Sequence, residues 1–249
     1  MKQSKIEVTP IHPERWGDDL DVVNAARVSF DKESDWVLDF TNDPKFGEGV
    51  LKEADRKLIY YLAKHKHTSP FNHSFITMRV KAPIFVARQL VKHKFMPWNE
   101  VSRRYVDSEP EFYFPGKGNW RERALNSKQG SGEAGAKLKP LYEDKEDLCG
   151  DYDNQFDPDI HASAVTEGAL SLYNDLIKSG IAPEQARMVL PQNMMTEWIW
   201  SGTLGAWLDM IKLRRGDGVQ EETKEVARIA YGYILQQFPV SAEAYVNAN

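Results

Sequence analysis

The chain has 249 residues, of which 41% are hydrophobic and 28% are charged, as is usual for soluble globular proteins. This composition excludes a disordered tail protein and a collagen-like chain, and the sequence contains no run of about 18 apolar residues that would predict a membrane span. No apolar stretch follows the first charges at the N-terminus, so we expect no secretory signal and a cytoplasmic protein.

Apolar periodicity and turn-forming residues place the elements of the first half of the chain. The segment 31–50 is acidic and rich in turn formers, so we interpret it as a loop. Residues 72–80 alternate in polarity, which predicts a strand. Helices are predicted at 18–28, at 51–65 and, with Pro83 in its first turn, at 83–94, followed by a loop at 98–100.

The second half begins with residues 116–158, whose clustered glycines and aspartates indicate a surface insertion. A long helix is predicted over 161–179, with Gly180 as its C-terminal cap. A strand is expected at 196–200. Further helices are predicted at 183–190, at 204–214, where Arg214 continues the apolar face, and at 226–233.

Charge is distributed unevenly along the chain. Lys and Arg number 32 against 37 Asp and Glu, and the resulting formal net charge of -5 disfavours a binder of large polyanions. Between Arg79 and Arg104, however, seven basic residues accompany a single acid, Glu100. A solvated basic face and a local site for an anion such as a phosphate both agree with this stretch.

Several common kinds of catalytic site have no counterpart in the sequence. His65, His67 and His73 do not share a helical face, and no zinc-site spacing occurs, so we predict no metal site. Cys149 is the only cysteine and lies among acidic residues that disfavour a thiolate, and no nucleophile-elbow serine occurs. No glycine-rich phosphate loop is present, so a bound nucleotide is expected to be held by side chains.

The segment 88–105 reads R-Q-L-V-K-H-K-F-M-P-W-N-E-V-S-R-R-Y. On the predicted helix, Gln89 is three residues from Lys92 and four from His93, which places them on one side. A polar helix end is one interpretation, and a site for a phosphate joined to a flat heterocycle is the other. The loop after the helix adds an amide, a carboxylate, a hydroxyl and a guanidinium, from Asn99, Glu100, Ser102 and Arg104.

This segment resembles the signature of flavin-dependent thymidylate synthases, in which Arg-His-Arg, seven residues and a serine follow one another. Here seven residues separate Lys-His-Lys at 92–94 from Ser102. Further segments resemble the family in the same order, and together they cover most of the chain outside 116–158. They are residues 25–30, 67–73, 80–89, 186–191 and 213–214.

The resemblance implies an α/β fold, with residues 1–249 as a single catalytic domain whose twisted, mostly antiparallel sheet is flanked by helices. It implies an enzyme that methylates dUMP to dTMP without an enzyme nucleophile. Methylenetetrahydrofolate would supply the carbon, and FAD reduced by NADPH would supply the hydride. It further implies a homotetramer with active sites shared between subunits. From the net charge and the lack of a long apolar run, we expect neither nucleic-acid nor membrane partners.

The same resemblance implies the candidate site residues one by one. The candidate catalytic residues are Arg214, which matches the arginine that polarises the uracil ring, and Ser102, which would lie near the pyrimidine. Positions that contact dUMP are matched by Gln89, Lys92, Glu100, Val101, Ser102, Arg103, Arg104, Arg187 and Arg214. Positions that contact FAD are matched by Ser29, His67, Ser69, Lys92, His93, Lys94, Asn99, Glu100, Thr203 and Asp209.

The chain also departs from the family pattern. Lys92 and Lys94 stand where arginine is usual, and lysine lacks the planar fork of a guanidinium. Thr203, Gly205 and Asp209 stand where asparagine, arginine and asparagine are frequent. These departures leave open a flavin-dependent hydroxymethylase acting on dUMP or dCMP. A second alternative is a non-catalytic protein that binds nucleotides or single strands with its basic stretch and tryptophans.

Overall fold

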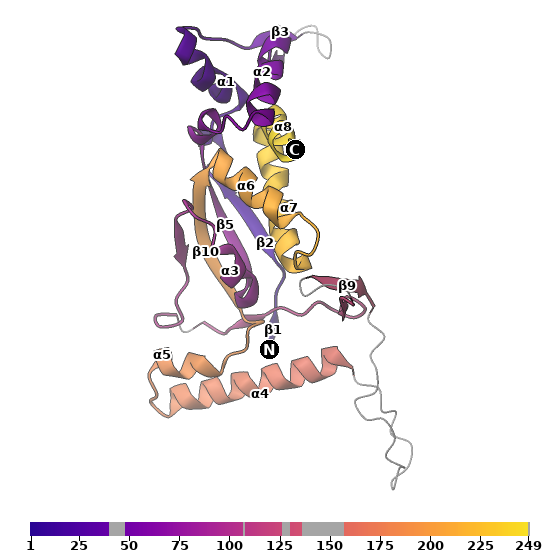
Figure 1. Ribbon diagram of the computed structural model, residues 1–249. Coiled ribbons are helices and arrows are strands. Elements are labelled where there is room, and N and C mark those ends of the chain that lie inside the picture. Colours follow the sequence, from indigo (N-terminus) through magenta and orange to yellow (C-terminus); the bar gives the residue numbers. More distant parts are fainter. Residues whose placement is uncertain (40–47, 107, 126–129, 136–156, 249) are drawn as a thin grey trace.

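The computed structural model describes residues 1–39, 48–106, 108–125, 130–135 and 157–248. Its centre is a four-stranded antiparallel sheet with the strand order β2-β5-β10-β6 (Figure 1). The two long central strands pair along their whole length, from Met195 opposite Pro83 to Thr203 opposite Phe75. The strands are β2 (Glu7–Ile11), β5 (Phe75–Pro83), β6 (Trp98–Glu100) and β10 (Met195–Thr203).

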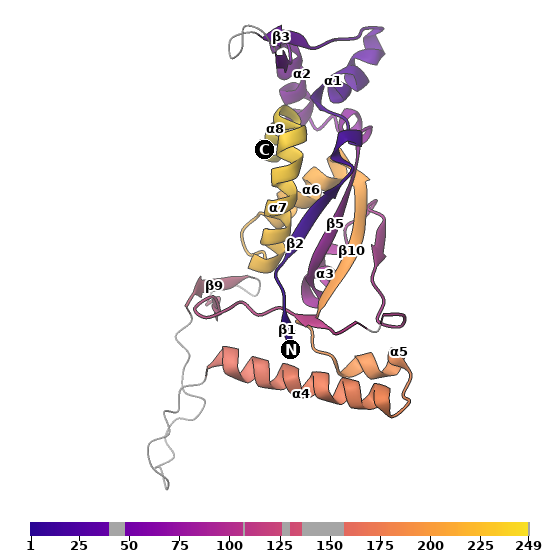
Figure 2. The same cartoon turned by 180° about the vertical axis from the view of Figure 1, so that it is seen from behind.

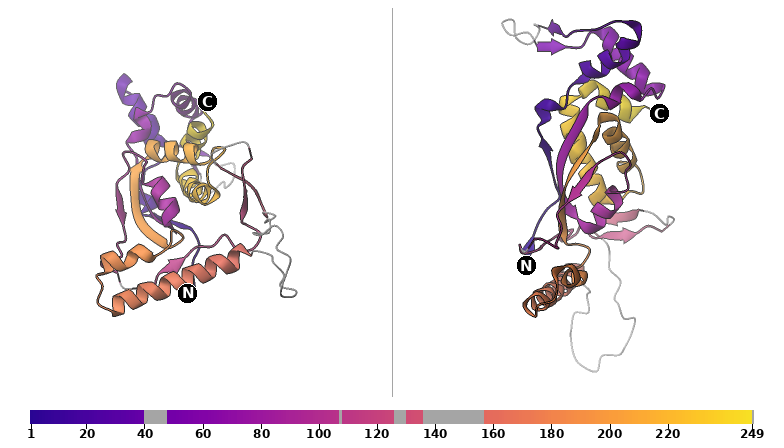
Figure 3. Two further views of the ribbon diagram at one scale, coloured as in Figure 1. Left: turned by 60° about the horizontal axis from the view of Figure 1, so that its bottom comes forward. Right: turned by 90° about the vertical axis from the view of Figure 1, so that its left-hand side faces the viewer.

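One face of this sheet is covered by helices and contains the main core. Alternation along β5 buries Ile76, Met78 and Val80, while Arg79 on the opposite face forms an ion pair of 2.6 Å with Glu197. Trp198 on β10 is buried on the covered face. The covering helices are α3 (Ile84–Leu90), α6 (Leu204–Arg214) and α7 (Glu221–Gln237), which Figure 3 shows gathered on one side of the sheet.

The remaining helices lie at the two ends of the sheet (Figures 1 and 2). At one end, α1 (Asp19–Arg27), α2 (Glu53–Lys64) and α8 (Pro239–Asn247) pack together. At the other end, near the N-terminus, α4 (Pro158–Lys178) and α5 (Pro183–Ala186) enclose a smaller apolar cluster with Phe112 and Met194.

Short pairs of strands and single turns of 3-10 helix complete the described structure. The parallel pair is β1 (Lys2–Gln3) with β7 (Glu111–Phe112). The antiparallel pairs are β3 (Val37–Asp39) with β4 (Glu48–Val50) and β8 (Arg121–Arg123) with β9 (Ser131–Ala134). The 3-10 helices are η1 (Pro13–Arg15), η2 (Val28–Phe30), η3 (Ser69–Asn72) and η4 (Arg187–Val189). Within these described parts, no helix is long and apolar enough to cross a membrane.

The α/β fold with a mostly antiparallel sheet is confirmed, and the predicted helices and strands at 18–28, 51–65, 72–80, 161–179, 196–200 and 204–214 are found within a few residues of their expected bounds. Gly180 follows the long helix with φ of 85°, as a C-terminal cap requires. The segment 183–190 divides into α5 and η4. The helix predicted at 226–233 is longer, and the separate helix α8 that follows it was not predicted.

Two loop predictions and one helix boundary are wrong. The segment 31–50 contains the pair β3 and β4, although residues 40–47 lie outside the described ranges. Residues 98–100 form the edge strand β6, because they pair with β10 and Trp98 stacks on Trp198 at 4.2 Å between ring centroids. The helix predicted to reach Lys94 ends at Leu90. Phe95 then adopts φ of 61°, and Met96 packs against Gly202.

The predicted insertion at 116–158 is described only in part. Its described residues include the β8–β9 hairpin, and Pro158 already begins α4. Residues 126–129 and 136–156, which include Cys149, lie outside the described ranges, so the interpretation of that cysteine stays a prediction.

The carboxylate of Asp19 joins the two ends of the chain. It is buried and accepts hydrogen bonds of 2.8 Å from the backbone N–H groups of Val240 and Ser241 at the start of α8. Because the first N–H groups of a helix have no partner within the helix, this side chain satisfies donors that would otherwise be buried without one.

We therefore expect Asp19→Ala to lower the free energy of unfolding by about 2–3 kcal/mol, since two charge-assisted hydrogen bonds are lost. Urea denaturation followed by circular dichroism measures the change. Glu167→Ala, which removes an exposed acid from α4, is the control and should shift the transition little. Equal shifts in the two variants would contradict the capping role.

Candidate functional site

A cavity of about 920 Å³ lies where β5 meets α3, beside the turn after β6 and the 3-10 helix η4. Four residues predicted from the sequence as dUMP contacts line it together, although they come from segments far apart in the chain: Glu100, Val101, Arg103 and Arg187. Its wall also contains Lys81 and Arg88. The cavity therefore brings four cations to one concave surface, whose lining also contains five carboxylates: Glu100, Glu109, Glu111, Glu184 and Glu197.

The cations of this cavity differ in whether they have partners. Lys81 lies 2.5 Å from Glu111, which also pairs with Lys2, and these two hydrogen bonds lower the pKa of Glu111 to about 2. Within the described ranges, Arg187 by contrast makes a single long hydrogen bond of 3.4 Å, from Nε to the backbone oxygen of Glu184. Arg88 and Arg187 have no carboxylate partner in the described part of the chain, so both guanidinium groups are free to bind an oxyanion.

The turn after β6 is held rigidly against the sheet. The Glu100 carboxylate accepts hydrogen bonds of 2.7 Å from Thr196 and 3.1 Å from the Trp98 indole. Val101 N–H donates to the backbone oxygen of Glu197 at 2.9 Å. The carboxylate beside the cavity is thereby fixed in position, and the residues that follow leave the sheet edge at a defined point.

Ser102 and Arg104 lie next to each other in that turn. Arg104 Nε donates to Ser102 Oγ at 3.3 Å, and its guanidinium lies 5.0 Å from the centroid of the Tyr105 ring. Arg103 donates to the backbone oxygen of Ser108 and lines the cavity. Burial lowers the pKa of Arg103, although a guanidinium remains charged.

A second cluster surrounds Arg214, the last residue of α6. Its Nε donates to His93 Nε2 at 2.9 Å, and its terminal nitrogen donates to the backbone oxygen of Gln89 at 3.1 Å. The Gln89 side chain is in turn fixed by Gln220, at 2.5 Å, and Thr223, at 3.1 Å. Within one chain, Arg214 does not line the cavity that contains Arg187.

The structure corrects how Gln89, Lys92 and His93 are arranged. Because α3 ends at Leu90, they do not share a helical face. His93 reaches Arg214 from a turn in which its own N–H donates to the backbone oxygen of Leu90 at 3.1 Å. Lys92 is exposed beside it. The sequence therefore identified residues that come together but gave the wrong geometry for them.

The electrostatics of this cluster follow from burial. Burial, and then the Arg214 charge, lower the pKa of His93 to about 4, so the imidazole is neutral at neutral pH. Its Nε2 accepts from Arg214, which places the ring proton on Nδ1. Burial also lowers the pKa of Arg214. A half-buried guanidinium with only neutral partners keeps an uncompensated positive charge, which favours an electron-rich or anionic ligand.

The residues matched to FAD contacts form two groups. Thr203 caps α6 by accepting from Ala206 N–H at 3.2 Å and donates to the Asn72 side chain at 2.7 Å. Asp209 accepts from the Tyr245 hydroxyl at 3.0 Å, and burial together with this carboxylate raises the pKa of Tyr245. The remaining positions are exposed and offer cations, hydroxyls, an imidazole and an amide: Ser29, His67, Ser69, Lys92, Lys94 and Asn99.

This exposed donor set fits the diphosphate and the sugar hydroxyls of a dinucleotide. Lys92 and Lys94 have no carboxylate partner in the residues that the structure describes, and η3 packs against both α1 and α6. Ser69 on η3 and Thr203 at the start of α6 therefore belong to one region of the surface. Across the described ranges, no group of three or more His, Cys, Asp or Glu side chains is arranged to hold a metal ion.

Gly205 has a structural reason to lack a side chain. A Cβ at this position would lie 2.5 Å from Asn72 Oδ1, the atom that accepts from Thr203. The Asn72 amide thus occupies the space that a larger residue at 205 would need. The departures at 203 and 205 are therefore linked through a single neighbouring side chain.

Several residues of these clusters were not identified from the sequence. Arg88 lies inside the quoted segment 88–105, and its position in the cavity wall without a carboxylate partner in the described residues makes it a candidate anion contact. Thr196, Gln220, Thr223 and Asn72 act by holding Glu100, Gln89 and Thr203, and only the tertiary structure brings them there.

An α/β sheet with free guanidinium groups around a cavity, and a further half-buried arginine with neutral partners, together offer positive charge to an anionic small molecule. Residues 14–240 match the family described as thymidylate synthase complementing protein, and the chain belongs to this family.

Relatives and solved structures agree over nearly the whole chain. Proteins called flavin-dependent thymidylate synthase are 32% identical in Thermosipho africanus, over 92% of this chain and 87% of the relative, and 35% identical in Thermus thermophilus, over 93% and 73%. The crystal structure of a UMP/dUMP methylase, PolB, from Streptomyces cacaoi with 5-Br dUMP is similar with a TM-score of 0.77 and 30% identity, over 100% of this chain and 98% of that one.

The neutral His93 predicts a pH dependence of stability. Its pKa is about 4 in the folded chain against 6.5 ordinarily, so between these values the unfolded state binds more protons and stability falls as the pH falls. His93→Gln keeps an acceptor for Arg214 but cannot be protonated. Denaturation at several pH values measures the free energy of unfolding. Between pH 6.5 and 4 this free energy should fall less steeply in the variant than in the unchanged protein. Parallel curves would show that His93 is not the responsible group.

The link between Gly205 and Asn72 predicts non-additive effects. Gly205→Ala should lower the free energy of unfolding by about 1 kcal/mol, because displacing the Asn72 amide outweighs the gain in helix propensity. In an Asn72→Ala background the same change should cost nothing or stabilise. A double-mutant cycle from urea denaturation measures the coupling, and an additive cycle would contradict the contact.

Proposed function

We propose that this chain is a flavin-dependent thymidylate synthase that methylates dUMP to dTMP. The observation that carries the proposal is the cavity in which Glu100, Val101, Arg103 and Arg187 meet, because each of them was matched to a dUMP position before the structure brought them together. Membership of the family and the names of the relatives support the same activity.

In this proposal the cavity binds the nucleotide through its phosphate. Arg187 and Arg88 lack carboxylate partners in the described ranges and would pair with the phosphate oxygens, where a guanidinium donates two parallel hydrogen bonds. Arg104 and Arg103 add positive charge on the turn, and Ser102 would lie near the pyrimidine. Because its hydrogen bonds to Thr196 and Trp98 hold the Glu100 carboxylate in place, this side chain would limit how deeply the pyrimidine ring of dUMP enters the cavity.

Arg214 would polarise the uracil ring. No cysteine nucleophile is needed if charge that develops on the ring is stabilised by a preorganised cation. The contacts from His93 and Gln89 hold the guanidinium in place while leaving its charge uncompensated. Lys92 and the Gln89 amide would complete the ring contacts.

FAD would be held by the exposed donors of the region around η3 and α6. Hydroxyl, amide, imidazole and cationic groups for it would come from Ser29, His67, Ser69, Lys94, Asn99 and Thr203. The resemblance also matches Lys92, His93, Glu100 and Asp209 to FAD contacts. When bound, FAD reduced by NADPH supplies the hydride, and methylenetetrahydrofolate supplies the carbon. The chain's own part is to orient the two rings and to exclude water.

We further propose a homotetramer whose active sites combine residues of several subunits. Arg214 and Arg187 belong to separate clusters within one chain, which supports completion of each site by a partner. Exposed apolar side chains on α4 and its neighbours support buried contacts between subunits: Ile160, Leu172 and Met188. A cytoplasmic enzyme of one catalytic domain, without membrane or nucleic-acid partners, completes the proposal.

A hydroxymethylase is the second candidate. The departures at Lys92, Lys94, Thr203, Gly205 and Asp209 fall at positions matched to flavin contacts, so they favour altered handling of the hydride. In that reaction the one-carbon unit is quenched by water instead. The base and sugar of the substrate also need testing, because the solved relative PolB is described as a methylase of both UMP and dUMP.

The mass of the nucleotide product distinguishes these candidates. We expect methylated dUMP when the protein is incubated without oxygen with FAD, NADPH, methylenetetrahydrofolate and dUMP, UMP or dCMP in separate reactions. A hydroxymethylated product would establish the second candidate, and absence of any product with flavin bound would refute both.

Arg214→Gln tests the role of the guanidinium in the same assay. Turnover should fall by about 10²-fold or more, since one preorganised charge is typically worth that much. Circular dichroism should show an intact fold, and dUMP should still bind through the cavity. Unchanged turnover would contradict the role, and Lys212→Gln on the same helix is the matched control.

A further inference from the structure

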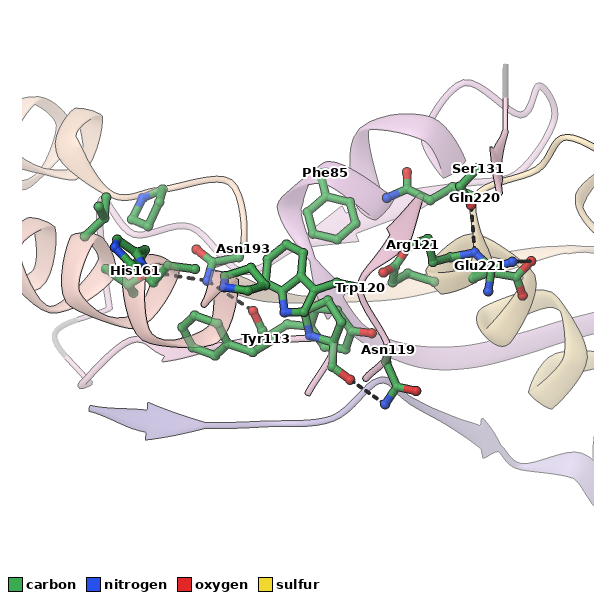
Figure 4. Close-up of a pocket in the computed structure, with 18 of the residues that line it drawn as sticks. Phe85, Tyr113, Asn119, Trp120, Arg121, Ser131, His161, Asn193, Gln220 and Glu221 are labelled. Carbon is green, nitrogen blue, oxygen red and sulfur yellow. Dashed lines mark hydrogen bonds and ion pairs between the residues drawn. The ribbon is translucent and has the colours of Figure 1, made fainter. Parts of the chain in front are cut away.

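A second cavity, of about 1080 Å³, lies between α4, the β8–β9 hairpin and the start of α7 (Figure 4). None of the residues matched to dUMP or FAD lines it. Part of its wall comes from the described beginning of the 116–158 segment, namely Asn119, Trp120, Arg121, Gly130 and Ser131. The proposed function gives no role to this cavity or to that segment.

Aromatic rings form the apolar part of the cavity. The rings of Phe85 and Tyr113 meet edge to face, with centroids 6.3 Å apart. The Trp120 indole is held by a hydrogen bond of 2.8 Å from Nε1 to Asp159. Figure 4 shows these three rings grouped at the centre of the cavity wall. Preorganised aromatic walls in a cavity of this size favour a flat ligand.

The polar lining of the cavity includes the carboxylates of Glu221 and Glu222 and the side-chain oxygen of Asn193 as hydrogen-bond acceptors. The amide nitrogen of Asn193 donates to the backbone oxygen of Tyr113 at 3.1 Å and to Thr166 Oγ1 at 3.5 Å. Its side-chain oxygen accepts no hydrogen bond from the described residues. Glu222 lies beside Tyr113 and accepts from its hydroxyl; burial, and then Glu222 and Glu225, raise the pKa of that phenol to about 12, so it stays a neutral hydroxyl. The remaining capacity of Asn193 Oδ1 and of the Glu222 carboxylate to accept hydrogen bonds favours a ligand that brings N–H groups.

The charges of the cavity disfavour a phosphorylated ligand. Two carboxylates, Glu221 and Glu222, line it together with one guanidinium, Arg121. That guanidinium already donates from Nε to Ser131 at 2.8 Å and lies 4.0 Å from Glu221. A group with several negative charges would therefore meet net repulsion, whereas an uncharged ring would not.

We propose that this cavity is a second binding site, for an uncharged flat heterocycle with two adjacent N–H donors. A carboxylate accepts two such donors side by side, as it does from a guanidinium. Guanine presents this edge through its ring N–H and its amino group, so the nucleoside guanosine represents the class. Glu222 would accept from this edge, the rings of Trp120 and Tyr113 would contact its faces, and Asn193 would accept a further donor.

The site lies next to the Arg214 cluster. Gln220 lines the cavity and accepts the hydrogen bond from the Gln89 side chain at 2.5 Å. Phe85, one helical turn before Gln89 on α3, also lines it. A ligand here would therefore contact the residues that hold Gln89 in place.

Isothermal titration of the full-length, assembled protein with three ligands tests the proposal. Guanosine should bind one per chain, about tenfold more tightly than inosine, which lacks only the amino group. GTP should bind more weakly than guanosine. Equal affinity for guanosine and inosine would overturn the donor edge, and tighter binding of GTP would overturn the charge argument. Absence of guanosine binding, as when a partner subunit fills the cavity, would overturn the site itself.

Variants locate the binding. Glu222→Gln should weaken guanosine about tenfold, because a charged acceptor is lost, and Val165→Trp should abolish binding by filling the cavity. Glu167→Gln, an exposed residue of α4 outside the lining, is the matched control. Arg187→Ala should leave guanosine affinity unchanged while it weakens dUMP, so a failure of this proposal is distinguishable from a failure of the proposed function. Unaltered affinity in both cavity variants would refute the location.

Discussion

The pairing of β5 with β10 over nine residues is the interaction on which the rest of the structure depends. Because the strands are antiparallel, α3 follows β5 at one end of the sheet, and α6 follows β10 at the opposite end. The first end receives η4 and the turn after β6, which create the cavity with Arg187. A shift of register by one residue would turn the tryptophans of β10 outward and separate these segments.

Arginines in this protein differ in what surrounds them, and their chemistry follows from that. Arg27 pairs with the buried Asp55 and holds α1 against α2. Arg187 has no carboxylate partner within the described residues and faces a cavity, and Arg214 is held by a neutral imidazole and a backbone oxygen. The first arrangement is structural, since its charge is neutralised. The other two leave positive charge available to a ligand, which agrees with the activity proposed for this member of the family.

Several helices, the central strand β5 and part of the candidate site could be predicted from the sequence, because local patterns and the family resemblance indicate them. Long periodic helices such as α2 and α4, and the alternating strand β5, are encoded by neighbouring residues. The candidate residues Glu100, Val101, Arg103 and Arg187 were found because the resemblance marks them individually. Neither result required knowledge of which segments pack together.

The parts that could not be predicted depend on distant contacts. β6 is a strand because Trp98 stacks on Trp198, about a hundred positions away, and its own three residues carry no strand pattern. The end of α3 at Leu90 is set by the turn that takes His93 to Arg214. Gln220 and Thr223 contribute by holding Gln89, which no local pattern indicates.

The buried Asp19 carboxylate at the start of α8 also has a consequence for synthesis of the protein. The helices α1 and α2 emerge from the ribosome well before the helix that covers them, which contains residues 239–247. Asp19 therefore remains without its two N–H partners until that helix has been synthesised. A nascent chain stalled before Pro239 would expose the apolar surface between these helices to chaperones.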